Sequence, residues 1–167
     1  PAAPWCTTLE GLSKTTVIKH ERDIVGDALR VVNCHEAVVY ALAPLRYAAL
    51  VGCTDCTVVL GAVGGIVKVE HCERMQVIGA CSRIRVSGCH DSTFYLGCAT
   101  GPMLIGDNRS LQVAPYNTYY ERLESDMARV GLRADANEWD RISLLMRDPG
   151  IGPGDREEES DADGDVA

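Results

Sequence analysis

The sequence predicts an all-β fold in which short parallel strands stack into a solenoid. One observation is a repeat of about nineteen residues, marked by cysteines and one asparagine. Another is a second register of apolar-glycine pairs that end short β-rich runs. The third is that one Phe and two Trp in 167 residues leave Val, Ile, Leu, Ala and Cys to fill the core, which suits thin coils. The repeat markers are Cys34, Cys53, Cys72, Cys89 and Asn108, and the pairs are Leu60-Gly61, Ile78-Gly79 and Leu96-Gly97.

The predicted strands and turns follow from these two series, the Cys and Asn markers and the apolar-glycine pairs. Residues 1–13 show little pattern, and we expect them to be a lead-in linker. Thr15-Thr16-Val17-Ile18 is rich in β-branched residues and predicts a first strand. Residues 24–114 then hold about five coils, each with a strand before the marker, a turn, a second strand and a corner that contains glycine. We expect the solenoid domain to span residues 14–117.

An apolar-x-apolar triplet before each marker predicts which side chains face the core. Strand side chains alternate between the two faces, so positions three and five before the marker point inward and the position between them points outward. The inward columns are Val31, Leu50, Val69, Val86, Ile105 and Leu29, Ala48, Val67, Ile84, Met103. The outward column is Arg30, Ala49, Lys68, Arg85 and Leu104.

The repeated cysteines are predicted to form a buried column of thiols. Parallel strands lie about 4.8 Å apart, so equivalent residues of successive coils stack directly on one another. A buried thiol behaves as a small apolar side chain, and we expect reduced, structural thiols here. Asn108 continues the column, where its amide can form hydrogen bonds along the stack.

The periodicity changes after Pro115. Thr118-Tyr119-Tyr120-Glu121 has the spacing of a capping box, and Gly131 suits a helix end. Between them, Tyr120, Leu123, Met127 and Val130 are at helical spacing. We expect this amphipathic helix to lie against the solenoid or to cap its open end. A short docking segment of either helix or strand, containing Trp139, Ile142 and Leu145, completes the region 118–147.

The charge of the chain is concentrated at its C-terminal end. The net charge is −8, yet residues 148–167 alone hold eight acids and one Arg. We expect this glycine-rich acidic segment to be a disordered, solvated tail, with a basic partner as the alternative. No basic stripe with interleaved aromatics predicts nucleic-acid binding, and no run of 18 apolar residues predicts a membrane span. No charged and then apolar leader indicates a secretion signal. The chain starts without Met, so we expect it to be a piece of a longer protein.

Several polar clusters are interpreted as structural. Cys53 and Cys56 form a lone C-x-x-C, and the Cys-His neighbours lie on different coils, so we expect no metal site and no cofactor. Glu36, Asp55 and Asp91 occupy equivalent turn positions, but Arg74 stands between them. This predicts a mixed-charge row of turns in preference to a pair of carboxylates for carbohydrate chemistry.

Arg85 is the residue with the clearest alternative role. It is predicted to project from a rigid strand, with Lys68 on the preceding coil. An arginine supplied to a partner can stabilise charge on a transferring phosphate and accelerate GTP hydrolysis. The plainer interpretation is a solvated arginine on a sheet face.

Several segments resemble the tubulin-binding cofactor C domain family, also called the TBCC or C-CAP domain. They are Leu42-Ala43-Pro44-Leu45-Arg46, Leu60-Gly61-Ala62-Val63-Gly64-Gly65, Ala80-Cys81-Ser82-Arg83-Ile84-Arg85, Phe94-Tyr95-Leu96 and Val113-Ala114-Pro115-Tyr116. The resemblance covers residues 15–132 and implies a short right-handed parallel β-helix. Tyr40 to Arg46 and Gly106-Asp107-Asn108 look most like the branch associated with centrosomes and basal bodies.

The resemblance implies two functions. Some members activate the GTPase of tubulin or of an Arf-like protein through a Gln-Gln-x-Arg motif. Here Arg85 is kept, but Ser82 and Arg83 replace both glutamines, and Met103-Leu104-Ile105 lacks an acid found in those members. We therefore expect a non-enzymatic scaffold of the cytoplasm and cytoskeleton. It would act at centrosomes, basal bodies or spindle poles and in microtubule-linked organelle positioning.

The expected partner-binding residues are Lys68, Ser82, Arg83 and Arg85, which would face tubulin or an Arf-like GTPase. The alternative is a GTPase-activating protein with Arg85 as its arginine finger. The sequence leaves the partner and the oligomeric state open.

Overall fold

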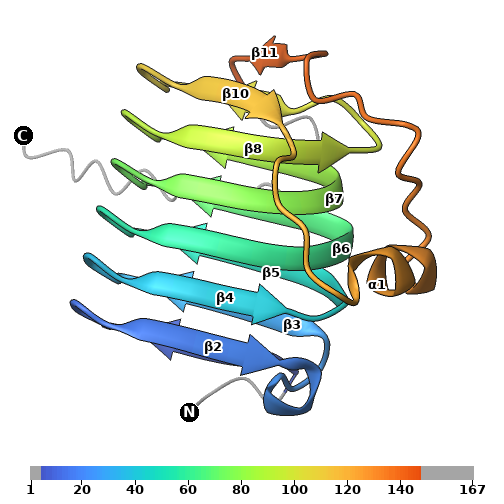
Figure 1. Cartoon of the computed structure of the whole chain (residues 1–167). Coiled ribbons are helices and arrows are strands. Elements are labelled where there is room, and N and C mark those ends of the chain that lie inside the picture. Colours follow the sequence, from blue (N-terminus) through green and yellow to red (C-terminus); the bar gives the residue numbers. More distant parts are fainter. Residues whose placement is uncertain (1–4, 148–167) are drawn as a thin grey trace, which may run out of the picture.

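The computed structural model describes residues 5–147 and shows a parallel β-solenoid of about six turns (Figure 1). Every strand pairing is parallel, which confirms the predicted fold class. The strands are β1 (Thr7–Glu10), β2 (Thr16–His20), β3 (Ala28–Val32), β4 (Val38–Leu42), β5 (Leu45–Val51), β6 (Thr57–Glu70), β7 (Gln76–Ser87), β8 (Thr93–Cys98), β9 (Met103–Ile105), β10 (Gln112–Pro115) and β11 (Ser143–Leu145). A 3-10 turn, η1 (Glu21–Asp23), and one helix, α1 (Leu123–Arg129), complete the fold.

The first turn of the solenoid begins earlier than the sequence indicated. The predicted first strand is confirmed as β2, which pairs with β4. The segment expected to be a lead-in also contributes a strand, since β1 pairs in register with β3 and Leu9 packs against the core. The coil that contains β1 lacks the cysteine marker of the later coils, so the marker spacing predicted about five coils and omitted this one.

Two layers of strands enclose the core. One layer contains β1, β3, β5, the second halves of β6 and β7, and then β9 and β11. The other contains β2, β4, the first halves of β6 and β7, and then β8 and β10. The long strands β6 and β7 continue through the corner between the layers, and they belong to both (Figure 1).

The turns between the layers repeat one backbone conformation. Two residues in most coils have a positive φ, a conformation in which Asn, Asp and His are enriched among non-glycine residues. The second series is the predicted row of turns: Glu36, Asp55, Arg74, Asp91 and Ser110 have φ between 48° and 54°. Arg74 pairs with Asp55 at 2.7 Å and holds the pKa of that carboxyl below its ordinary value. These acids therefore act within the turns, as predicted.

The thiol column is confirmed. Each thiol donates to a carbonyl of the preceding coil, as with Cys53 to Val31, where the Sγ–O distance is 3.5 Å. Cys72 and Cys89 repeat this contact one coil further along each time. All eight cysteines are free and buried. Asn108 ends the column: its Oδ1 accepts the Cys89 amide at 2.9 Å, which confirms the predicted hydrogen bonding along the stack.

The inward and outward columns are confirmed for four coils and wrong for the last. Val31, Leu50, Val69 and Val86 are at most 1% exposed. In the last coil, however, Met103 pairs with Arg85 and Leu104 pairs with Val86, so Leu104 faces the core and its two neighbours are in outward register. Ile105 is nevertheless buried, at 8% exposed. The reason is one extra residue, Asp107, between the left-handed Gly106 and Asn108. Counting back from Asn108 therefore slips the register by one, and one residue exchanges the faces.

The helix is present, but it starts later than the capping box suggested. Its N-cap is Arg122, with no side-chain cap, and the Thr118 hydroxyl instead bonds to Asn117. Tyr120, in the turn before α1, donates its phenol to the buried Asp126 of the helix at 3.0 Å. The C-terminal stop is confirmed, since Gly131 has φ +79°.

Helix α1 lies at the side of the coils, against β6, and not over the open end (Figure 1). Met127 and Val130 pack with Ala62, Ala80 and Leu132 of the corner. The docking segment is a strand: β11 pairs with β9, and Trp139 packs against the core. No helix within residues 5–147 is long and apolar enough to cross a membrane. The acidic segment 148–167 lies outside the described residues.

Candidate functional site

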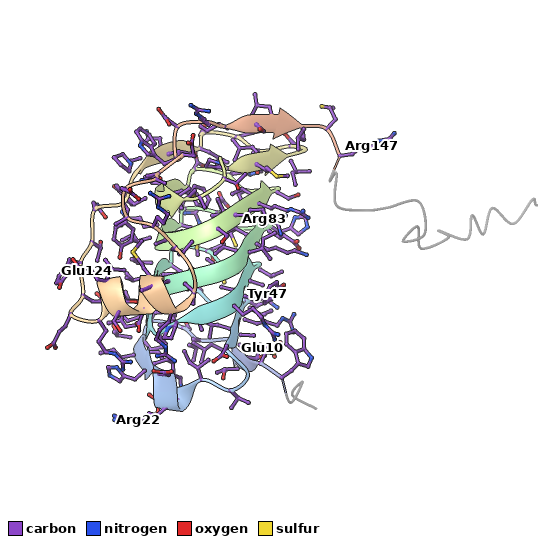
Figure 2. All side chains as sticks on the ribbon, turned by 90° about the vertical axis from the view of Figure 1, so that its right-hand side faces the viewer. Glu10, Arg22, Tyr47, Arg83, Glu124 and Arg147 are labelled. Atoms are coloured by element: carbon purple, nitrogen blue, oxygen red, sulfur yellow. The ribbon has the colours of Figure 1, made fainter. Side chains whose placement is uncertain are left out.

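The predicted site residues come together on the outer surface of β3, β5, β6 and β7. In the register, Lys68 stands beside Arg85 and Ile66 beside Arg83, and Arg30 continues the Lys68 row two coils away. We call this surface the basic face, with charged members Glu10, Arg30, Lys68, Glu70, Arg83 and Arg85. Figure 2 shows Glu10, Tyr47 and Arg83 one above another along this side of the solenoid.

Strand alternation produces the basic face. Ile84 and Val86 are each 1% exposed and fill the core, so Arg83 and Arg85 must point outward from the same strand. The strand is held on both sides, since β7 pairs with β6 below and with β9 above. The cations are thus carried by a backbone fixed in the middle of the solenoid.

Ser82 sits at the corner next to this face and has a structural bond. Its hydroxyl donates to the Gly64 carbonyl at 2.7 Å. The register shifts here, because Gly64 and Gly65 both stand opposite Ser82. A Cβ on Gly65 would lie 2.2 Å from the Arg46 carbonyl oxygen, so the close approach of these coils needs glycine. Ser82 therefore helps to fix the corner from which Arg83 and Arg85 extend.

Three of the cations, Arg30, Lys68 and Arg83, form no hydrogen bond or ion pair within residues 5–147. Arg30 and Lys68 are half-buried, and Arg83 is exposed. Lys68, Glu70, Arg85, Ser87 and Ile105 surround a hollow of only about 80 Å³. Small-molecule pockets are usually about 300–1,000 Å³. The arrangement suits contact with the surface of another molecule better than enclosure of a nucleotide or metabolite.

An aromatic pair that the sequence reasoning missed borders the basic face. Trp5 and Tyr47 meet edge to face, with ring centroids 6.4 Å apart. They line a hollow with Arg46, Ile66 and Arg83. Burial raises the pKa of Tyr47, and the charge of Glu70 adds to the shift, so the phenol stays neutral. Aromatic and arginine side chains together are typical of protein interfaces. The available signal was the register, because Tyr47, Ile66 and Arg83 occupy one row.

The register and strand neighbours of Arg85 do not include the glutamines that the arginine-finger motif would supply. Its neighbours in the register are Lys68 and Met103, and the outward neighbours on its own strand are Arg83 and Ser87. None of the four is a carboxylate or a carboxamide. Lys68 and Met103 therefore flank Arg85 along its row, and Glu70 lines the same hollow as Arg85.

The other polar clusters serve the coils. No group of three or more His, Cys, Asp or Glu in residues 5–147 could hold a metal ion. The two thiols of the C-x-x-C face backbone carbonyls: Cys56 donates to Thr54 at 3.3 Å and Cys53 to Val31. His35 contacts the Thr54 hydroxyl at 2.9 Å and lies 3.1 Å from Glu36. These side chains connect successive turns.

The molecule is thus a parallel β-solenoid with a corner-docked helix and a rigid basic face. Residues 26–144 match the family model described as Tubulin binding cofactor C, and the chain belongs to this family. It is similar to TBCC domain-containing protein 1 of mouse, at 32% identity over 83% of the chain. Identity to the rat protein of that name is 35% over 87% of the chain, and to the human one 31% over 81%. The chain spans about a quarter of the length of these relatives: 25% in mouse, 26% in rat and 24% in human.

Proposed function

We propose that this domain is a non-catalytic docking module in microtubule-linked organisation, acting at the centrosome, basal body or spindle pole. The observation that carries the proposal is the basic face itself. Lys68 and Arg83 project from paired strands and have no polar partner within residues 5–147. Cations held in this way are available to a carboxylate-rich surface, and the adjacent Trp5 and Tyr47 supply apolar contact.

The partner that fits this surface is an acidic protein, and tubulin is our first choice. The family's description as tubulin binding supports that choice. Complementary charge mainly accelerates encounter and selects partners, and its effect weakens as salt screens it. Binding should therefore fall steeply between low and physiological ionic strength. Ser82 contributes indirectly, by fixing the corner through its bond to Gly64.

The test measures binding of the full chain to tubulin dimers at 50 and 150 mM salt. The double variant Lys68→Glu/Arg83→Glu should bind at least about tenfold more weakly than wild type, since it reverses two contacting charges. The matched control is Lys14→Glu/Arg22→Glu, which changes the net charge equally on residues outside the basic face. Glu36 already occupies the backbone conformation of Lys14, with φ 48° against 50°. Equal loss in both variants would show that only net charge matters and would refute the site.

The second candidate function is activation of a GTPase, and the presence of Arg85 on the same face favours it. An arginine finger contributes about 10³–10⁵ to the rate of GTP hydrolysis. The test is single-turnover hydrolysis by tubulin and by Arf-like GTPases with wild type and with Arg85→Ala. We expect no acceleration by either chain, because Ser82 and Arg83 stand where the activating members carry two glutamines. Acceleration of tenfold or more that disappears in Arg85→Ala would establish the catalytic function instead.

Location in the cell is tested separately. A fluorescently tagged full-length protein should concentrate at centrosomes or basal bodies. The Lys68→Glu/Arg83→Glu variant should lose this signal if the basic face carries the recruitment. If wild type and variant concentrate there equally, another part of the protein carries the targeting, and the basic face is not the determinant.

A further inference from the structure

The acidic segment 148–167 begins next to the basic face. Strand β11 continues the layer that carries this face: Leu145 pairs with Ile105, which pairs with Ser87 of β7. Arg147 follows β11 by two residues. In Figure 2, Arg147 lies above Arg83 on the same side of the solenoid, whereas Glu124 of α1 lies toward the opposite side. Arg147, the last residue that the structure describes, therefore lies at the upper end of the basic face.

The segment is long enough to reach every cation in this region. Lys68 lies three strands below β11, through β9 and β7. At about 4.8 Å per strand, that is a distance of about 14 Å. A twenty-residue segment treated as a random chain has an end-to-end distance of about 25 Å. Its central acids, Glu157, Glu158 and Glu159, come nine to eleven residues after the chain passes position 148. Geometry allows them to lie over Lys68 and Arg85.

The charges are complementary, and the basic face groups Arg30, Lys68 and Arg83, which form no ion pair within residues 5–147. Lys14, Lys19 and Arg22 also form none, but they lie around β2 and η1, at the other end of the solenoid from Arg147. Most arginines elsewhere are engaged: Arg129 pairs with Glu21, Arg74 with Asp55, Arg109 with Asp107, Arg133 with Asp135 and Arg141 with Glu138. The outer row Thr16, Val38, Thr57, Gln76, Thr93 and Gln112 on the opposite layer carries no charge. Lys68 and Arg83 remain without a partner in residues 5–147, and Glu70 is the nearest opposing acid.

We propose that segment 148–167 binds the basic face of its own chain and competes there with the acidic partner. The inference rests on the proposed function, because the two ligands share one surface. A short tether supplies an effective concentration of about a few mM. If the free segment binds with a Kd of about 1 mM, cis occupancy weakens the apparent affinity for the partner about threefold to fivefold.

The direct test needs no partner. A nitroxide is attached to Ser160→Cys in the full chain, and the eight native thiols are buried, so labelling is selective. Paramagnetic broadening of backbone amides is then measured at 50 mM salt. We expect the amides of Lys68, Arg83 and Arg85 to broaden at least about threefold more than those of Thr57 and Gln76 on the other layer. Raising the salt to 500 mM should remove the difference, since the screening length at that concentration is only about 4 Å.

Controls separate specific contact from general attraction. In the labelled chain, Lys68→Glu/Arg83→Glu should abolish the selective broadening, whereas Lys14→Glu/Arg22→Glu should leave it intact. Equal broadening on both layers in wild type, or broadening that persists in the face variant, would overturn the proposal. Folding of each variant is checked from the dispersion of the same spectra.

A second measurement distinguishes this inference from the proposed function. Glu157→Gln, Glu158→Gln and Glu159→Gln are combined, and tubulin binding is compared with wild type. Binding that strengthens about threefold supports competition in cis. Unchanged binding to tubulin, together with no selective broadening, rejects the cis contact and leaves the docking function standing. Selective broadening without any tubulin binding rejects tubulin as the partner and leaves the cis contact standing.

Discussion

Replacing Val69 by Asp tests the assignment of faces more severely than any surface change. Val69 is fully buried, and its two neighbours in the inward column are Leu50 and Val86. Removing a buried valine side chain from the core costs about 1.5–3 kcal/mol. The new carboxylate would also lie among apolar side chains with no cation beside it. Both terms act on a domain whose whole stability is expected to be about 5–15 kcal/mol.

The free-energy cost of burying the new carboxylate can be estimated, and it depends on pH. Burial raises the pKa of a carboxyl, and a rise of about three units corresponds to about 4 kcal/mol at pH 7. The folded-state pKa then lies above the unfolded value of about 3.9, so the penalty is absent below that value and grows as the pH rises to the folded pKa. Val69→Asp should therefore lose about 5–7 kcal/mol at pH 7 and recover part of it near pH 4.

The assay is urea unfolding of the full chain at pH 7 and pH 4.5, followed by circular dichroism. Val69→Ala isolates the loss of apolar contact, and Lys68→Asp places the same carboxylate one residue away on the outer face. We expect Lys68→Asp to change the free energy of unfolding by less than about 1 kcal/mol. A chain that tolerates Val69→Asp but unfolds on Lys68→Asp would show that inside and outside have been exchanged.

Three further predictions concern the corner, the end of the thiol column and the helix. Gly65→Ala should lower the free energy of unfolding by several kcal/mol, because its Cβ would lie 2.2 Å from a backbone carbonyl oxygen of the preceding coil; thermal unfolding measures this. Asn108→Ala should cost about 1–3 kcal/mol by leaving a backbone amide of the preceding coil without its acceptor, which chemical denaturation detects. Arg129 lowers the pKa of Glu21, so their contact stabilises the docked helix above the ordinary glutamate pKa and is lost as the pH falls through the lowered one. Arg129→Ala should weaken that acid-side dependence in a pH titration of the melting temperature, and the contact of Arg122 with Glu21 should retain part of it.

The sequence repeat predicted most of the fold because every coil of a solenoid has the same strand pairing and the same core packing. Each coil must bury the same columns, so the spacing of Cys34, Cys53, Cys72 and Cys89 was enough to assign the inside and outside of four coils. The same argument placed Lys68 and Arg85 side by side on the outer surface. Periodicity gives register directly wherever successive coils have equal length, since equivalent residues then pair across parallel strands.

The errors arose where the coils are not equal or where a contact lies outside the repeat. Asp107 lengthens the last turn by one residue, which exchanged the faces of Met103 and Leu104. The capping box at Thr118 had the right residue types, but Tyr120 lies in the turn before the helix and donates to Asp126 within it, and the helix starts at Leu123. Tertiary contacts of this kind leave no local pattern in the sequence.

The division between inward and outward columns also explains how one fold can carry different functions. The core requires only that inward positions stay apolar, so an outward row can change residue by residue at little cost in stability. In this chain the row through Arg85 reads Arg30, Ala49, Lys68, Arg85 and Met103. Such a row keeps a stiff cation between a second cation and a thioether, and Glu70 lines the hollow next to it. Binding to an acidic surface needs only charge on a rigid frame, whereas catalysis also needs groups that orient the guanidinium to within about 0.5 Å. Under the proposed docking function the strand needs only to hold its cations rigidly, whereas activation of a GTPase would add the requirement for groups that orient Arg85.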